Sequence, residues 1–448
     1  MTDCPEQITF SFHPSKDVLV DFQGGQISSD AGLLPLIELD RRLGWTAQVS
    51  SLLHDDRQAG KTEHSLPQLL RQRFFGLIAG YEDCNDHTRL RGDPILKAAT
   101  GKPLEKDLAS QPTFSRFENA ATAREVAQIN RLLPEQFIQV HRGRKMKQII
   151  LDIDPTDDPC HGHQQLALFN GFYDQYMYYP LLVYERDSGM LLGVRLQAGN
   201  ASAPKRAVQL LKPIIDRLRQ EWPDLEIVIR GDAAFGCPQM YRFCEGNDLG
   251  YLLGLKASKP LQERTEWALE WIKERFERDG RACRHLGGFR YQAGTWEHER
   301  HILYKVEVNK EGTNRRFVIT NRKGLPCHLW PQYNDRGTAE TFIDDFKNGL
   351  EMDRLSCERF VANAFRLVLS AVAYNLLRVF REALVGTELE TASIETIRSR
   401  LIKIGARVRQ TVRRIWVHLS SAFPLRELLG RVVAAIEGLP PPVPASSG

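Results

Sequence analysis

Apolar and polar positions along the chain follow three successive patterns. From about residue 28 to 145, apolar side chains recur at steps of three and four, as at Leu70 and Phe74, which predicts a mostly helical region. From Lys147 onward, short and almost continuous apolar runs predict buried strands. After Leu255, a charged helix followed by alternating segments predicts a β-rich insertion.

Four strands and one helix are predicted between residues 147 and 232. The strands are KQIILDID, QYMYYPLLVY, MLLGVRLQ and LEIVIRGD, and the helix APKRAVQLLKPIIDRLRQEW precedes the last of them. The turn ERDSG predicts a hairpin between the second and third strands. This order of elements predicts an α/β fold with a mixed sheet and a crossover helix.

A later segment, YNDRGTAETFIDDFKNGL, carries two stripes of residues at helical spacing. If the segment is helical throughout, one polar stripe consists of Tyr333, Arg336, Glu340 and Lys347. The neighbouring apolar stripe is expected to bury against a core and consists of Ala339, Ile343, Phe346 and Leu350. Taken alone, the same pattern also fits an amphipathic surface helix with Arg–Glu pairs.

Composition argues against several classes of protein without indicating one function. The 448 residues are 42% hydrophobic and 26% charged, with a net charge of only +4, so local clusters say more about partners than the global balance. Eight cysteines without a C-x-x-C pair argue against a zinc ribbon or a disulfide framework and fit a reducing cytoplasm. The N-terminus lacks a secretory pattern, and the apolar run from Phe360 to Leu384 contains enough polar residues to predict a buried core helix.

Two of the predicted strands end in aspartates. Asp152 and Asp154 project from the same face of one strand, and Asp232 follows another. Active sites of open α/β sheets gather at strand ends, so these acids and Glu340 are expected to converge. Three carboxylates from distant positions are typical of a Mg²⁺ site, and two ions about 3.5–4 Å apart can promote phosphodiester cleavage. The alternative is that each aspartate only caps a strand or forms a turn.

At these residues the chain resembles a known family. The Y-x2-R-x3-E-x6-K spacing from Tyr333 to Lys347 is similar to the signature of cut-and-paste DDE transposases of bacterial insertion sequences. The D-x-T at Asp154 and the strand IVIRGDAAF resemble the surroundings of that family's first two catalytic aspartates. The resemblance covers about residues 15 to 430 and implies a ribonuclease H-like mixed-sheet core with a β-rich insertion.

The implied organisation has six parts. They are a mostly helical DNA-binding region at 1–145, the first part of the core at 146–256, the insertion at 257–332, the rest of the core with the glutamate helix at 333–385, a helical and basic region at 386–436, and a disordered tail at 437–448.

The resemblance also implies a mechanism and partners. Asp154, Asp232 and Glu340 would be the catalytic residues and would hold two Mg²⁺ ions, for which Mn²⁺ substitutes. Water would attack a phosphodiester at the transposon end, and the freed 3′-OH would attack target DNA. The partners would be double-stranded transposon ends and target DNA, bound by a homodimer in the cytoplasm at the nucleoid, with no membrane.

Several cations are expected to contact DNA. The resemblance implies that Arg336 and Lys347 bind phosphates beside the metals and that Tyr333 donates a hydrogen bond to a phosphate. The stretch 396–416 carries seven Lys or Arg and no acid, and its alternating later part predicts a basic hairpin. Its candidates for phosphate contact are Arg407, Arg409, Arg413 and Arg414, and the alternative is a solvated face.

Some assignments stay open at the level of the sequence. Asp152 is an alternative first ligand or a supporting acid, although the D-x-T match favours Asp154. Trp296 and Trp330 are candidates to stack a flipped base, or else they pack the core of the insertion. Two other functions are a catalytically inactive DNA-binding relative and a metal-dependent glycosyltransferase that uses Asp152 and Asp154. The second leaves the segment from Tyr333 to Lys347 unexplained.

Overall fold

The computed structural model of the protein describes residues 7–439. The chain forms two compact units. Unit 1 combines the residues up to Phe117 with those from Val379 onward, and unit 2 spans Glu118–Arg378. Thus the N-terminal and C-terminal regions, which the sequence divides into separate parts, share one unit. Most of the predicted disordered tail, 437–448, lies outside the described residues.

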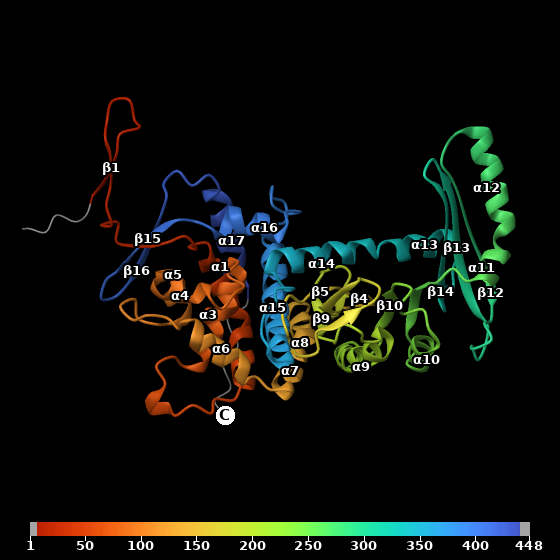
Figure 1. Ribbon diagram of the computed structural model, residues 1–448, viewed down its shortest axis with the longest axis horizontal. Helices are drawn as coiled ribbons and strands as arrows, with labels where there is room; N and C mark the ends of the chain where they lie inside the picture. Colours follow the sequence, from red (N-terminus) through yellow and green to blue (C-terminus); the bar gives the residue numbers. More distant parts are fainter. Residues whose placement is uncertain (1–6, 440–448) are drawn as a thin grey trace, which may run out of the picture. The chain divides into compact units, whose positions relative to one another are not determined.

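Unit 2 is built on one mixed eight-stranded sheet (Figure 1), which agrees with the predicted α/β class. The strand order is β12-β13-β14-β11-β10-β4-β8-β9, and only β4, β10 and β11 run parallel to one another. The strands are β4 (Gln148–Pro155), β8 (Leu181–Glu185), β9 (Leu191–Arg195), β10 (Glu226–Gly231), β11 (Gly250–Leu255), β12 (Cys283–Tyr291), β13 (Arg300–Asn309) and β14 (Gly312–Thr320).

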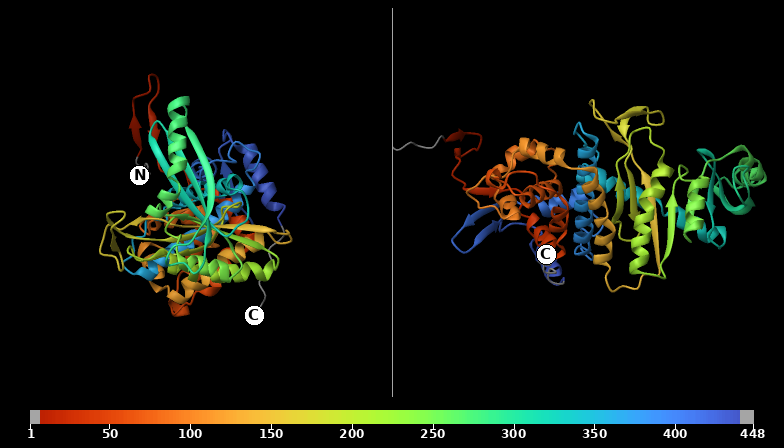
Figure 2. Two further views of the ribbon diagram at one scale, coloured as in Figure 1. Left: turned by 90° about the vertical axis from the view of Figure 1, so that its right-hand side faces the viewer. Right: turned by 90° about the horizontal axis from the view of Figure 1, so that it is seen from below.

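Helices cover both faces of this sheet (Figures 1 and 2). The crossover helix α9 (Ala203–Glu221) packs so closely on β9 that a Cβ at Gly193 would lie 2.7 Å from Ile214. Tyr184 of β8 points to the opposite face and contacts Phe342 of α14 (Gly337–Leu350), with ring centroids 5.8 Å apart. Helices α7 (Ala123–Asn130), α8 (Leu132–Val140) and α10 (Pro238–Gly246) complete the α9 side.

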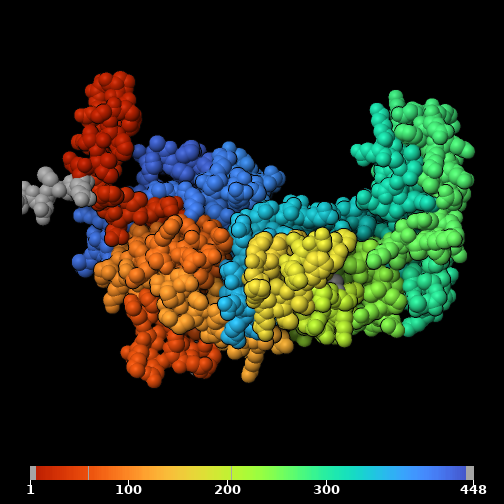
Figure 3. Space-filling view, in the orientation of Figure 1, coloured from red at the N-terminus to blue at the C-terminus, as the bar shows by residue number. Residues whose placement is uncertain are grey.

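The predicted β-rich insertion extends the core sheet instead of forming a sheet of its own. Strand β14 pairs antiparallel with β11, and β13 and β12 continue outward from it. The predicted charged helix is two helices, α11 (Lys259–Arg264) and α12 (Glu266–Asp279), and α12 packs on β12 and β13. In Figure 3 this part of unit 2 stands out beyond the strands of the core.

The predicted strand QYMYYPLLVY is wrong as a single element. The structure divides it into β7 (Gln175–Tyr178), in a small sheet with β5 (Asp158–Pro159) and β6 (Leu168–Asn170), and β8 in the main sheet. The division falls at Pro180, whose nitrogen carries no hydrogen to donate to a strand ladder.

The segment from Tyr333 to Leu350 is not helical throughout, which corrects that expectation. Helix α13 (Pro326–Asn334) ends before α14 begins, and the turn between them holds Asp335 and Arg336. Short-range bonds tighten this junction, since Arg336 N–H donates to Tyr333 C=O at 3.1 Å. The predicted apolar stripe of α14 is confirmed, because all four of its residues are buried.

The predicted core helix is α15 (Phe360–Glu382). By length and composition it is the one helix among residues 7–439 that could cross a membrane, but 83% of its apolar window is buried in protein. Asn375 on this helix accepts from the N–H of Leu191 and donates to the same residue's C=O, at 2.8 and 2.9 Å. These bonds satisfy backbone groups at the edge strand β9, as a covered sheet edge requires.

Unit 1 is mostly helical, as its sequence predicts. Its N-terminal helices are α1 (Leu33–Leu43), α2 (Trp45–Leu52), α3 (Leu66–Ala79), α4 (Asp86–Arg89), α5 (Pro94–Thr100) and most of α6 (Gln111–Ala120). The C-terminal part adds α16 (Ile394–Ile397), α17 (Arg426–Glu437) and the predicted basic hairpin, β15 (Ala406–Gln410) and β16 (Ile415–Leu419), which pairs with β3 (Gln26–Ser28). A two-stranded arm, β1 (Ile8–Phe10) and β2 (Val18–Val20), precedes β3.

Candidate active site

Strand β4 carries two aspartates whose surroundings differ. Asp152 is directly opposite Arg230 of β10 in the parallel ladder, and both side chains are almost fully buried. Arg230 Nε and Nη2 donate to the two carboxylate oxygens of Asp152 at 2.5 and 2.6 Å. This bidentate pair uses both oxygens of Asp152 inside the sheet. Asp152 is therefore poorly available as a ligand, which favours Asp154.

Asp154 and the other two predicted acids come from three elements. Asp154 lies near the end of β4, Asp232 follows β10 directly, and Glu340 is in the first turn of α14. Asp232 stabilises its own turn, since its Oδ1 accepts from Ala234 N–H at 2.9 Å. Glu340 is the most accessible of the three, with 64% of its side chain exposed against 14% for Asp154.

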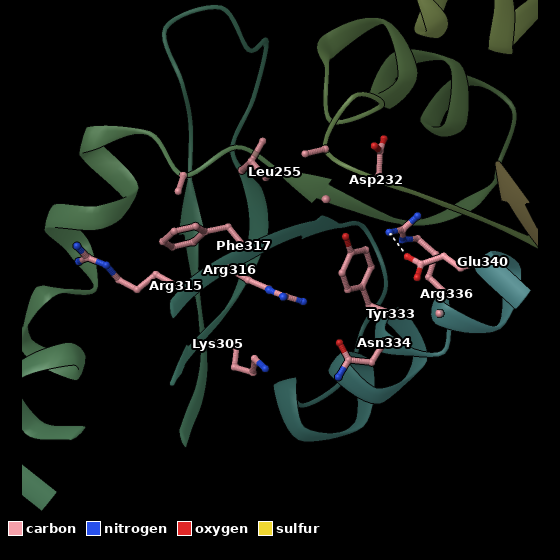
Figure 4. Close-up of a pocket in the computed structure, with 14 residues that line it drawn as sticks. Asp232, Leu255, Lys305, Arg315, Arg316, Phe317, Tyr333, Asn334, Arg336 and Glu340 are labelled. Carbon is pink, nitrogen blue, oxygen red and sulfur yellow. Dashed lines mark hydrogen bonds and ion pairs between the residues drawn. The ribbon is translucent and has the colours of Figure 1, made fainter. Parts of the chain in front are cut away.

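Arg336 lies between two of these carboxylates. Its guanidinium donates to Asp154 Oδ2 at 2.6 Å and to Glu340 Oε1 at 3.2 Å, the second of which is drawn in Figure 4. The turn between α13 and α14 positions this side chain, so the break in the predicted helix belongs to the site. With one guanidinium among three carboxylates, the site holds an excess of negative charge.

The pKa of Asp154 is set mainly by its burial. Burial raises the pKa of Asp154 to about 7, Arg336 opposes the rise, and the charges of Asp232 and Glu340 add to it. A carboxyl in this state gains most from a nearby cation, because a cation favours its ionised form.

Tyr333 reaches the same pocket from the end of α13. Burial raises the pKa of Tyr333, so its hydroxyl stays protonated and able to donate a hydrogen bond. Its approach depends on Gly254 of β11, since a Cβ there would lie 2.8 Å from the Tyr333 hydroxyl and 2.7 Å from Ala233 N. Sequence reasoning missed Gly254, because only the folded chain shows what passes over it.

A cavity of about 660 Å³ joins these residues to the hairpin β13–β14. Asp232, Arg336 and Glu340 line one end of it, and the hairpin lines the other (Figure 4). The hairpin residues that line it, all missed in the sequence, are Lys305, Arg315, Arg316 and Phe317. The only sequence signal for them was a cation inside each of two alternating strand segments.

Lys347, the last member of the polar stripe, is engaged with another acid. Its ammonium donates to Asp157 Oδ1 at 2.9 Å, and this contact lowers the pKa of Asp157 despite the opposing effect of burial. Lys347 follows Glu340 by seven residues on α14, about two helical turns, and its ammonium bonds to Asp157.

The three acids have the right chemistry for a divalent cation, but in this structure they are too far apart to bind one together. In the described part of the chain, no group of three His, Cys, Asp or Glu side chains is close enough to hold a metal ion. The donor set nevertheless fits a hard cation, because Asp154, Asp232 and Glu340 offer only carboxylate oxygens. Burial is the main cause of the raised pKa of Asp154, and the charges of Asp232 and Glu340 add to it.

Neither predicted base-stacking tryptophan is open to a base in this arrangement. Trp296 is 9% exposed and packs edge-on against Tyr241 and Tyr291, and Trp330 is 2% exposed in the apolar cluster beneath α13. The packing alternative describes both positions.

In unit 1, the basic hairpin presents its cations to solvent. Trp416 and His418 lie opposite two of the arginines, and their rings stack with centroids 6.1 Å apart. Exposed cations beside stacked rings suit a nucleic-acid surface. The four predicted arginines, all exposed, are Arg407, Arg409, Arg413 and Arg414.

Comparison with known proteins supports one family. The family described as "Transposase DDE domain group 1" matches residues 10–441 of the chain. No curated protein matches the chain.

Proposed function

The chain belongs to the DDE transposase family, and from this premise we propose that it cuts and joins DNA at the terminal inverted repeats of its own insertion sequence. The finer assignments that follow, including Mg²⁺, strand transfer and the site residues, are parts of the same proposal. Members of this family generally use divalent metal ions.

One observation carries the proposal. Arg336 donates to both Asp154 and Glu340, and Asp232 lines the same cavity as Arg336 and Glu340, although the three acids are separated by 78 and 108 positions in the sequence. A structural role for each acid separately would not require three carboxylates to gather around one guanidinium.

The proposed metal ligands are Asp154, Asp232 and Glu340. When bound there, Mg²⁺ would lower the pKa of water and stabilise the leaving oxygen of a phosphodiester. Arg336 would exchange its bonds to Asp154 and Glu340 for bonds to a DNA phosphate, for which its fork geometry is suited. Tyr333 would donate its hydroxyl hydrogen to a phosphate oxygen, and Lys347 would bind the backbone as a point charge.

DNA binding away from the cut is assigned to unit 1. The exposed arginines of β15–β16 support contact with phosphates, and the stacked Trp416 and His418 support contact with a sugar or base. This part of the proposal agrees with the predicted DNA-binding roles of the N-terminal and C-terminal regions. A homodimer on paired ends is also proposed, from the family alone.

The test uses the DNA that flanks the coding gene. Incubation of the protein with this duplex and Mg²⁺ or Mn²⁺, followed by mapping of the ends, is expected to give cuts at the borders of a repeat with 3′-OH termini. Binding without cleavage in either metal would instead identify an inactive DNA-binding relative. A protein that binds nucleotide-sugars and no duplex would support the glycosyltransferase alternative.

A further inference from the structure

The face of the sheet beneath α13 changes character at one pair of residues. Leu303 of β13 and Val318 of β14 are cross-strand partners on this face, and they pack with Leu329 and Trp330 of α13. The next pair along the same face is Lys305 and Arg316. Because directly opposite residues share a face, these two cations stand side by side where the apolar cluster ends.

Neighbouring arginines on β14 have different surroundings. Arg315 points to the other face, where it donates to Glu266 Oε2 at 2.7 Å and to Gln262 C=O at 3.0 Å. Arg316 is exposed, and no hydrogen bond or ion pair engages its guanidinium among residues 7–439. In Figure 4, Arg316 extends toward Tyr333, whereas Arg315 extends in the opposite direction.

Placing Lys305 and Arg316 opposite each other is electrostatically unfavourable in the folded protein. Like charges directly opposite in a ladder repel, and Lys305 alone has an acidic partner, Glu307 at 2.6 Å. An anion between Arg316 and Tyr333 would remove the repulsion. Tyr333 offers a protonated hydroxyl on the same side, so the anion would meet one guanidinium and one hydroxyl donor.

We propose that Arg316, supported by Lys305, binds a backbone phosphate of the DNA strand that enters the cavity, at the end opposite Asp232 and Glu340. The proposal rests on the function proposed above and adds a second contact point to it. A strand held at Arg316 and at Arg336 would be fixed at two points of the cavity that Asp232 also lines, which restrains the linkage to be cut. Arg316 is thus a positioning residue and lies outside the four-residue signature.

The test compares phosphates one at a time. Duplexes from the flanking DNA carry a neutral methylphosphonate at a single position near the mapped cut, and their affinities are measured in EDTA, where no cleavage occurs. With the native protein, neutralising the phosphate at Arg316 is expected to weaken binding about tenfold, as loss of one charge-assisted contact would. With Arg316→Ala, that same position is expected to have no effect, while every other position keeps its effect.

Matched variants separate this role from a general loss of charge. Arg316→Lys is expected to keep the sensitive position, since it keeps the charge. Arg278→Ala, on α12 across the other face of the sheet, removes an equal charge and is expected to leave the whole profile unchanged. Arg316 is exposed, so its variants are expected to unfold at the native temperature.

The two proposals fail in different ways. A profile for Arg316→Ala identical to the native one, from a protein that still cuts the duplex, overturns the role of Arg316 alone. A native protein that binds none of the duplexes overturns both the role of Arg316 and the proposed function.

Discussion

The interior of β4 and its outer end contain the same side chain in opposite situations. At the inner position, Asp152 has a built-in cation, Arg230, and the pair is closed to solvent. At the outer position, Asp154 shares one arginine with Glu340 and lies near a third acid. The comparison teaches that residue type alone does not make an aspartate a candidate ligand. It becomes one where the fold leaves its charge incompletely neutralised.

The largest expected effect is at the open end. Glu340→Gln keeps the size of the side chain but removes a charged oxygen donor, and is expected to lower end cleavage by about 10³-fold, equivalent to about 4 kcal/mol in the barrier. DNA affinity in EDTA is expected to change little. Gel analysis of cleaved duplex checks the rate, with the exposed neighbour Asp344→Asn as the control. Cleavage at the native rate in Glu340→Gln would refute the assigned site.

Disrupting the buried pair of Asp152 and Arg230 is expected to lower the stability of the protein and not to act on the chemical step directly. Asp152→Asn leaves Arg230 buried without its charge partner and is expected to cost about 3–5 kcal/mol of unfolding free energy. Asp154→Asn is the matched variant, two residues away on the same face. It is expected to abolish cleavage while leaving stability equal or higher, because burial already disfavours the charged form.

Denaturant unfolding of the two variants measures this difference. If both lose the same free energy of unfolding, the contrast between a closed pair and an open site is wrong.

A smaller effect is expected from the glycine under Tyr333. Gly254→Ala introduces a Cβ that would lie within 3 Å of both the Tyr333 hydroxyl and the turn after Asp232, so both must shift. A displacement of about 1 Å is expected to lower cleavage about 10²-fold while the protein stays folded. Gly246→Ala, where an added Cβ meets nothing within 4 Å, is the control. Equal rates for the two variants would remove Gly254 from the site.

The smallest effect, when expressed per unit of pH, concerns a third aspartate, which has neither a closed pair nor an open site. Asp158 is fully buried, neither of its carboxylate oxygens has a hydrogen-bond partner in the described chain, and burial raises its pKa to about 8. Asp353 and Asp157 add to this rise, and Lys347 and Arg366 oppose it.

The sign of the resulting pH dependence follows from proton binding. Between the ordinary aspartate pKa near 3.8 and about 8, the folded state binds a proton that the unfolded state has released, so this group lowers stability as pH rises. The loss is at most about 1.4 kcal/mol per pH unit and levels off above the folded pKa. Asp158→Asn is expected to flatten this slope and to be more stable than the native protein at pH 8. Thermal melts from pH 5 to about pH 9 check it, and parallel curves for the two proteins would contradict it.

Several features of the fold followed from sequence patterns alone. Continuous apolar runs gave β4 and β10, alternation gave the basic hairpin, and the spacing of Ala339 to Leu350 gave the buried stripe of α14. These patterns succeed because burial of one face is decided locally by the period of the side chains. Their spacing and the resemblance also predict one site for Asp154, Asp232, Glu340 and Arg336, and in the structure Arg336 bonds to Asp154 and Glu340.

Tertiary structure decided which charges are compensated. Arg230 neutralises Asp152 only because β4 and β10 pair in one register, and Arg316 reaches Tyr333 only because the insertion continues the core sheet. The helix break at Arg336 and the burial of Trp296 and Trp330 likewise depend on what packs around them. A sequence specifies where a charge is along the chain, but the distance to its partner, and so its energy, exists only after the strands are paired.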